Sequence, residues 1–215
     1  LVGDGPDKSI VKWSVNPPLS DAHYTALDAL VHGERLYTSL AFLHTFALEN
    51  LKLESSDTFT GKLVMRNGTA EPGWLRNTHL VVPTPPLSGG SPTALYMQDA
   101  ANTFIAGCLF QSPNHCLYAL RQVTYIRISG SVFRFRGMNV SFNGGGHNHV
   151  IYDNVFEVHG SPEENGWLRH TDSVPNPGFF FASFRSQPYC RDLLLANNWS
   201  ENKMVNHSPR GFVGY

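Results

Sequence analysis

Four ionisable side chains in the middle of the chain are spaced so that they could share one surface. Arg134 and Arg136 alternate with phenylalanines, and Glu157 and His159 each follow them 23 residues later. Alternate residues of a strand face opposite sides, so we expect both arginines to point outward and the phenylalanines inward. Guanidinium groups bind carboxylates in a forked geometry, and a histidine or glutamate can transfer protons. These residues could therefore bind an acidic ligand and act on it.

A segment rich in ionisable and aromatic residues follows this patch, within roughly residues 158–177. Arginine would hold the carboxylate of an acidic sugar, histidine or a carboxylate would move protons, and tryptophan would stack on the sugar ring. The candidate catalytic residues are Arg134, Glu157, His159, His170 and Asp172. The candidate substrate-binding residues are Arg136, Trp167 and Arg169.

The chemistry that these residues favour is β-elimination on an acidic polysaccharide, because neutralising a uronate carboxylate acidifies the neighbouring C5 proton. Hydrolysis would need two carboxylates about 5–9.5 Å apart, and Glu157 with Asp172 is the pair that we can offer. A different interpretation is that Arg134 and Glu157 belong to a surface ladder of ion pairs, each contributing about 0.5 kcal/mol. The protein would then be a non-catalytic glycan-binding or structural module of an extracellular assembly.

The elements that must position these residues repeat with a fixed period. Residues 105–110, 128–133 and 151–156 each place apolar residues at positions one, five and six, and the three segments start 23 residues apart. Such a period indicates a solenoid, in which each coil buries its apolar face against its neighbours. We predict one inward column of Ile105, Ile128, Ile151 and Leu194, and a second of Phe110, Phe133, Phe156 and Trp199.

A second strand repeats in phase with the first, since residues 114–120 align with residues 137–143. Residues 178–184 fit the same slot, and both strands then place one inserted loop of about 18–20 residues within roughly residues 158–177. In the turn between strands, we expect Asn154 and Asn197 to share a position with Ser131 and Cys108. Asparagines stacked in this way would hydrogen-bond along the solenoid axis.

These repeats, together with the glycine-rich opening Leu1–Trp13, resemble right-handed parallel β-helices of the pectin-lyase-like superfamily. The resemblance covers residues 1 to about 204 and implies an all-β fold of about 23-residue coils with the one inserted loop. It does not extend to an active-site signature: the paired-aspartate pattern of polygalacturonases is missing, and no stretch matches the calcium site of pectate lyases. β-Helices of this kind are mostly secreted or surface proteins, so the resemblance implies an extracellular or cell-surface setting. We expect residues 1–215 to form a single β-helix domain of a longer chain.

Composition excludes several classes of partner. The net charge is −1 and no basic stripe occurs, so nucleic acid is not expected to bind. No apolar run is long enough for a transmembrane helix. Nothing in the sequence identifies a cofactor, while assembly with other chains is compatible with the fold. Glycosylation sequons with accessible positions occur at Asn67, Asn139 and Asn206.

Cysteines and histidines leave fewer possibilities. Cys108 and Cys116 could form a disulfide, or they and Cys190 could be three buried thiols. His147 and His149 would share one face of an extended strand, with His149 at an inward position. No cysteine or carboxylate completes a ligand set around these histidines, so we predict no metal site.

Overall fold

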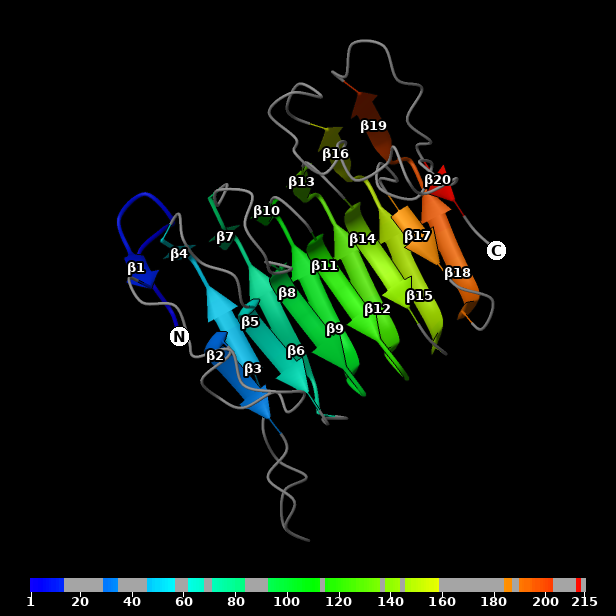
Figure 1. The fold of residues 1–215 in the computed structure, drawn as a ribbon, viewed down its shortest axis with the longest axis horizontal. Helices are drawn as coiled ribbons and strands as arrows, with labels where there is room; N and C mark the ends of the chain where they lie inside the picture. The colour runs from blue at the N-terminus through cyan, green and yellow to red at the C-terminus, as the bar shows by residue number, and fades with distance from the viewer. Residues whose placement is uncertain are drawn as a thin grey trace, which may run out of the picture.

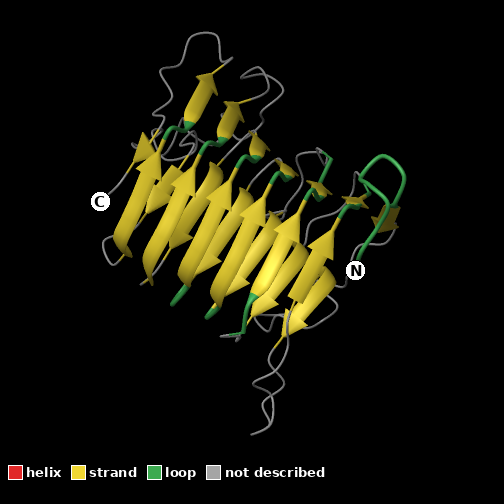
Figure 2. Ribbon diagram, turned by 180° about the vertical axis from the view of Figure 1, so that it is seen from behind, coloured by secondary structure: helices red, strands yellow, loops and turns green. Residues whose placement is uncertain are grey.

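The structure of the protein is a computed structural model that describes residues 1–13, 29–34, 46–56, 62–67, 71–83, 93–112, 115–135, 138–143, 146–158, 184–186, 190–202 and 212–213. Within these residues the chain forms strands and no helix. The strands lie in three sheets, and every pair of neighbouring strands within a sheet is parallel, which makes the fold a β-solenoid (Figures 1 and 2). The predicted all-β solenoid is thus confirmed.

Each coil contributes one strand to each sheet in turn, from sheet C to sheet A to sheet B. Sheet A contains β3 (Phe46–Glu49), β6 (Gly73–Arg76), β9 (Ala101–Ala106), β12 (Thr124–Ser129), β15 (Gly146–Tyr152) and β18 (Cys190–Ala196). Sheet B contains β1 (Ile10–Trp13), β4 (Lys52–Ser55), β7 (His79–Val81), β10 (Leu109–Ser112), β13 (Val132–Phe135), β16 (Val155–Val158) and β19 (Trp199–Asn202). Sheet C contains β2 (Ala29–Glu34), β5 (Lys62–Asn67), β8 (Thr93–Gln98), β11 (His115–Leu120), β14 (Met138–Asn143), β17 (Phe184–Ser186) and β20 (Phe212–Val213).

The core consists of columns of identical or similar apolar side chains that run along the solenoid axis. Ile105, Ile128 and Ile151 are register partners in sheet A and are fully buried, as the period predicts. In sheet B the rings of Phe110 and Phe133 stack with centroids 4.8 Å apart, and a ring centroid distance of 5.1 Å joins the second of these to Phe156. The centroid distances match the strand spacing of about 4.8 Å, so each ring packs directly on the one below.

The predicted columns are wrong by one residue in the last coil. Ile151 pairs with Leu195, and Leu194 is 55% exposed on the outer face of sheet A. Trp199 pairs with Val155 instead of Phe156 and is 68% exposed. Three consecutive leucines at positions 193–195 make the alternatives almost equal in hydrophobicity, and only the backbone pairing decides between them.

The same coil contains a longer insertion than the sequence predicted. Phe184, not a residue near 181, is the partner of Val140, so residues 178–184 are not the equivalent of residues 137–143. Sheets A and C both place this coil 44 residues after its neighbour, where the preceding coil needs 23, so the insertion has 21 residues. The extra residues all lie between Val158 and Phe184, because these two are 26 positions apart and their partners Phe135 and Val140 are 5 apart.

The turn from sheet A to sheet B is encoded by residue type. Its first position has a positive φ angle in successive coils, and residues that tolerate this conformation occupy it: Asn50, Asn77, Gly107, Gly130, Asp153 and Asn197. The next position points inward and forms a polar ladder. The N–H of Ser131 donates to Asn154 Oδ1 at 3.0 Å, and the N–H of Asn154 donates to Asn198 Oδ1 at 3.1 Å. The ladder position is therefore held by Asn198, and the prediction of Asn197 was wrong by one residue.

The two neighbouring histidines of β15 point to different sides. His149 is fully buried, as predicted, whereas His147 is exposed and lies edge-on to the ring of Tyr125. The residue between them, Asn148, has a φ angle of 61°, which interrupts the alternation of an extended strand. The expectation that both histidines share one face was wrong for this reason.

Candidate functional site

The two predicted site residues that the structure describes are in contact. Arg134 and Glu157 are register partners on β13 and β16, and Arg134 Nε lies 2.6 Å from Glu157 Oε2. The side chain of Arg134 is 44% exposed and that of Glu157 is 17% exposed, so both belong to the outer face of sheet B. Gln111 precedes Arg134 in the same row. The in–out alternation predicted for β13 is correct, because Phe133 is buried beside Arg134.

The other predicted site residues lie outside the described residues: Arg136, His159, Trp167, Arg169, His170 and Asp172. The register nevertheless locates where their segment leaves the solenoid. The insertion starts directly after Val158, which is the neighbour of Glu157 in the chain. The Arg134–Glu157 pair therefore lies where the inserted residues leave sheet B.

An aromatic side chain that the sequence placed in the core joins this face. Trp199 continues an outer row that contains Leu109, Val132 and Val155. It lies one strand away from Glu157 and two residues along, beside the register partner of that glutamate, Glu201. The outer face of sheet B thus presents an exposed indole next to an arginine–glutamate pair. The corrected period of 44 residues is the signal that would have found it.

The row that contains Arg134 holds further ion pairs at its other end. Lys12 Nζ lies 3.7 Å from Glu54 Oε1, and Lys52 Nζ lies 2.5 Å from Glu54 Oε2. The hydrogen bond from Lys52 is the main cause that lowers the pKa of Glu54, and burial opposes it. Oppositely charged neighbours thus recur along sheet B, as the ion-pair interpretation of Arg134 and Glu157 expects.

His79 is a half-buried imidazole on the same face. It lies on β7, where Leu109 is its partner in the next coil. Its pKa is lowered, chiefly by burial and further by the charges of Lys52 and Arg134, while Asp7 opposes the change. The imidazole is therefore neutral at pH 7 and able to accept a proton.

The described cysteines are structural. Cys108 and Cys116 are free and buried, so the disulfide alternative does not apply to them. Burial raises the pKa of Cys108 to about 11 and raises that of Cys116 further, which keeps both thiols protonated. Cys190 begins β18, and nothing is known of its side chain. Among the described residues, no group of three histidine, cysteine, aspartate or glutamate side chains could hold a metal ion.

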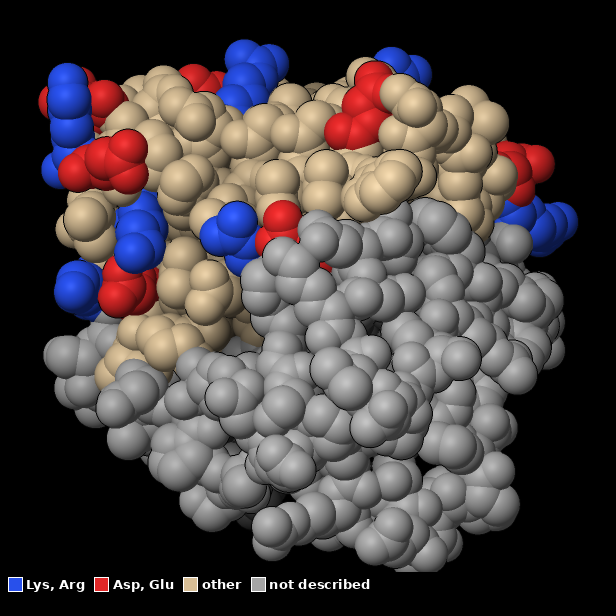
Figure 3. All heavy atoms as spheres, turned by 90° about the horizontal axis from the view of Figure 1, so that it is seen from above, with Lys and Arg blue, Asp and Glu red and all other residues tan. Residues whose placement is uncertain are grey.

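The predicted glycosylation sites fall partly on strands of sheet C. Asn67 ends β5 and Asn139 lies in β14, while Asn206 is outside the described residues. On the face seen in Figure 3, the described basic and acidic side chains are interspersed among uncharged ones. No helix within the described part of the chain is long and apolar enough to cross a membrane.

Comparison with protein-family models, with curated proteins and with solved structures finds no match to this chain.

Proposed function

We propose that the protein is an extracellular β-helix of the pectin-lyase-like kind that binds an acidic polysaccharide on the outer face of sheet B and cleaves it by β-elimination. The observation that carries the proposal is the neighbourhood of Trp199, Arg134 and Glu157 where a 21-residue insertion leaves the solenoid. Long loops on rigid scaffolds commonly carry binding and catalytic groups. The indole offers a flat apolar surface for a sugar ring, and the guanidinium offers donors for a uronate carboxylate.

In the proposed reaction Arg134 pairs with the carboxylate of the sugar at the cleavage point. In its described ion pair it uses only its Nε donor, which leaves the Nη donors for a substrate. A base, either Glu157 or a histidine of the inserted segment such as His159 or His170, removes the C5 proton. The electron pair forms a double bond between C4 and C5, the C4–O bond breaks, and the departing oxygen takes up a proton. No oxidant or other co-reactant is required.

A second function is favoured by the ion pairs along sheet B. Arg134 and Glu157 already neutralise one another, and Lys12 and Glu54 do the same in the same row. A protein that only binds glycan, or that builds a larger surface assembly, would need such a row for solubility and register and would need no free base. The two functions predict the same binding face and differ in turnover.

The experiment is to incubate the protein with a panel of acidic polysaccharides and to follow the ultraviolet absorbance of unsaturated uronate products. Binding is measured in parallel by calorimetry. We expect Arg134→Ala to lower kcat/KM by about 100-fold or more, as loss of one charge-stabilising group does. Trp199→Ala should weaken binding. Lys12→Ala is the matched control, because it breaks an ion pair in the same row far from the insertion and should change neither measurement.

The outcomes separate the two functions. Binding without unsaturated product, weakened by Arg134→Ala and by Trp199→Ala, would favour the non-catalytic module. Turnover that survives Arg134→Ala unchanged would show that this face is not the active site. Absence of both binding and turnover across the panel would contradict an acidic polysaccharide as the ligand.

A further inference from the structure

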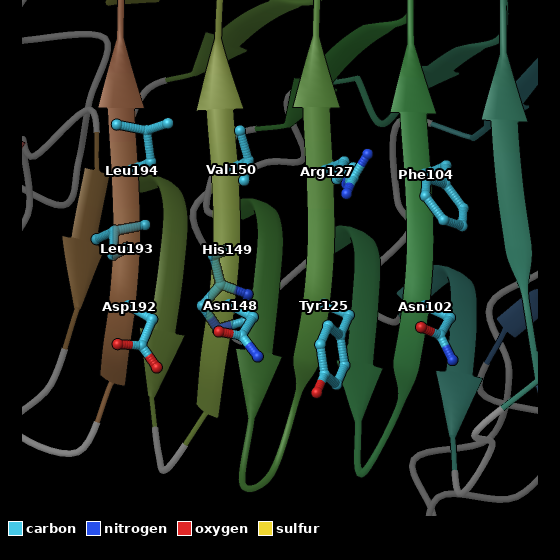
Figure 4. A pocket seen from close by; sticks show the side chains of 10 residues that line it. All are labelled: Asn102, Phe104, Tyr125, Arg127, Asn148, His149, Val150, Asp192, Leu193 and Leu194. Carbon is cyan, nitrogen blue, oxygen red and sulfur yellow. The ribbon is translucent and has the colours of Figure 1, made fainter.

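A groove of about 480 Å³ lies on a different face of the solenoid, along the outside of sheet A (Figure 4). It crosses β9, β12, β15 and β18, so it runs along the solenoid axis instead of along a strand. Neighbouring strands lie about 4.8 Å apart, and the groove therefore offers equivalent positions at that interval. Neither the ion pairs of sheet B nor the insertion after Val158 contributes a lining residue.

One wall of the groove is a row of polar side chains at a specialised backbone position. The row contains Asn102, Tyr125, Asn148 and Asp192, and their φ angles of 53°, 54°, 61° and 54° are all in the left-handed region. Because this conformation interrupts the alternation of the strand, it sets the row apart from the neighbouring outward row, which forms the second wall. Asparagine and aspartate occupy this conformation readily.

Tyr125 is the exception in that row. A bulky residue with a left-handed conformation is an outlier, and such outliers concentrate at functional sites. Its ring is 47% exposed and is held edge-on by His147 at a centroid distance of 5.3 Å. Packing within the solenoid does not explain a tyrosine here, whereas presentation of a flat aromatic surface in the groove does.

The opposite wall is apolar except for one cation. It contains Phe104, Arg127, Val150 and Leu194, one from each strand. The guanidinium of Arg127 lies 6.0 Å from the ring centroid of Phe104. Among the described residues no carboxylate lies within ion-pair distance of Arg127, whereas Arg76, Arg121 and Arg134 each have such a partner. The groove therefore contains a cation that lacks a described carboxylate partner, next to an aromatic surface.

These features fit a sugar chain better than a peptide. The backbone groups of β9, β12, β15 and β18 pair with neighbouring strands, so the face of the sheet offers a peptide no main-chain hydrogen bonds. It does offer amide, hydroxyl and carboxylate groups on one wall and apolar or aromatic surface on the other. A sugar ring presents the matching pair of surfaces, with hydroxyl groups at its rim and C–H groups on its face.

We infer that the sheet A groove binds an extended acidic polysaccharide, with one sugar per coil and a uronate carboxylate on Arg127. Asn102, Asn148 and Asp192 bind hydroxyl groups, and Tyr125 supports a ring face. The inference rests on the proposed function only for the acidic nature of the polymer. It adds a second binding track, separate from the sheet B face, that could hold a long chain while another part of it is processed.

The experiment is a titration of ¹⁵N-labelled protein with oligogalacturonides of increasing length, read by NMR at two separate reporters. The Arg127 guanidinium N–H reports on the groove, and the Trp199 indole N–H reports on sheet B. We expect the groove affinity to rise with length up to about four sugars, one for each lining strand at about 4.8 Å per strand. Tyr125→Ala and Arg127→Ala should each weaken the groove affinity by at least about tenfold.

Tyr152→Ala is the matched control. This tyrosine is 39% exposed on the same sheet but does not line the groove, so its loss should leave the affinity unchanged. Shifts at Trp199 alone would overturn the groove and leave the sheet B proposal standing, and shifts at Arg127 alone would do the reverse. Shifts at neither reporter would contradict both. Variants in the groove that change self-association but not oligosaccharide binding would assign the face to a second copy of the chain and overturn the inference.

Discussion

Inside the solenoid, His149 occupies a place that an apolar side chain could fill. It belongs to the inner column that contains Ile126 and Leu193, and its ring packs on Phe142 at a centroid distance of 4.6 Å. The N–H of Ile126 donates to its Nδ1 at 3.4 Å, so the neutral form is the one that the core accommodates. Burial, with a further contribution from the charge of His147, lowers the pKa of His149 from 6.5 to about 4.

This pKa makes the stability of the fold depend on pH. Unfolded His149 takes up a proton below about pH 6.5, while the folded protein resists protonation until about pH 4. Stability from this residue is therefore complete above pH 6.5 and falls as the pH drops towards 4, by about 3 kcal/mol in total. His149→Leu should remove that part of the dependence, since leucine occupies the same column at position 193.

Urea unfolding of both proteins at several pH values between 4 and 7 checks this prediction, since the range brackets the two pKa values. The difference in unfolding free energy between wild type and variant should shift in favour of the variant as the pH falls. His147→Leu is the control, because that residue is exposed, and most of the dependence should remain. A difference that is constant with pH would show that His149 is not protonated on unfolding.

At the scale of the strand, the aromatic column determines where stability lies. Phe133 is fully buried and stacks on Phe110 and Phe156, so truncation leaves a cavity with rings on both sides. Phe133→Ala should cost about 3–5 kcal/mol of unfolding free energy. Arg134→Ala, one residue away but facing outward, removes a partly exposed ion pair and should cost less than about 1 kcal/mol.

Thermal or denaturant unfolding of the two variants measures both costs under the same conditions. The comparison is strict because the residues are neighbours in one strand and differ mainly in the direction of the side chain. Equal losses would contradict the observed alternation of β13. A large loss in Arg134→Ala alone would mean that the ion pair with Glu157 carries structural weight beyond its exposure.

The strands show how far the sequence predicts this fold. The 23-residue period predicts the columns at Ile128 and Phe133, because uninterrupted coils of equal length leave one self-consistent register. After the insertion the period alone cannot determine the register, and three consecutive leucines permit three alignments. The structure settles it through backbone pairing and through Asn198, whose side chain continues the inner ladder.

The candidate sites divide in the same way. The contact between Arg134 and Glu157 was predictable, since it needs only the period and strand alternation. The outward position of Trp199 depends on the shifted register and was not. The groove of sheet A depends on left-handed residues, and a tyrosine at position 125 gives no sequence signal for that conformation. Only the stacking of coils reveals that Tyr125 shares its place with two asparagines and an aspartate.

For the whole molecule, the insertion after Val158 is the main departure from a regular solenoid. The strands on either side of it remain paired with their neighbours, β16 with β13 and β17 with β14. Regular coils before and after the insertion therefore continue the same three sheets. An insertion that leaves the sheets in register is free to carry function, because the core columns do not depend on its sequence.

This arrangement allows the insertion to be removed by design. Replacing residues 159–183 with the residues of the preceding coil at 136–139 would restore its 23-residue spacing, since Val158 and Phe184 correspond to Phe135 and Val140. We expect the shortened protein to unfold cooperatively with a stability close to that of wild type, as measured by denaturant unfolding. If sheet B and the insertion form the catalytic site, the same change should abolish turnover of acidic polysaccharide.

The groove of sheet A supplies the internal comparison for this deletion. None of its lining residues belongs to the replaced segment, so oligosaccharide binding there, read at the Arg127 guanidinium, should persist. Full turnover in the shortened protein would move the active site away from the insertion. Loss of cooperative unfolding would show that the inserted residues cover part of the core and are structural. Loss of turnover with the fold and the groove intact would separate two roles along one solenoid, one that holds the polymer and one that acts on it.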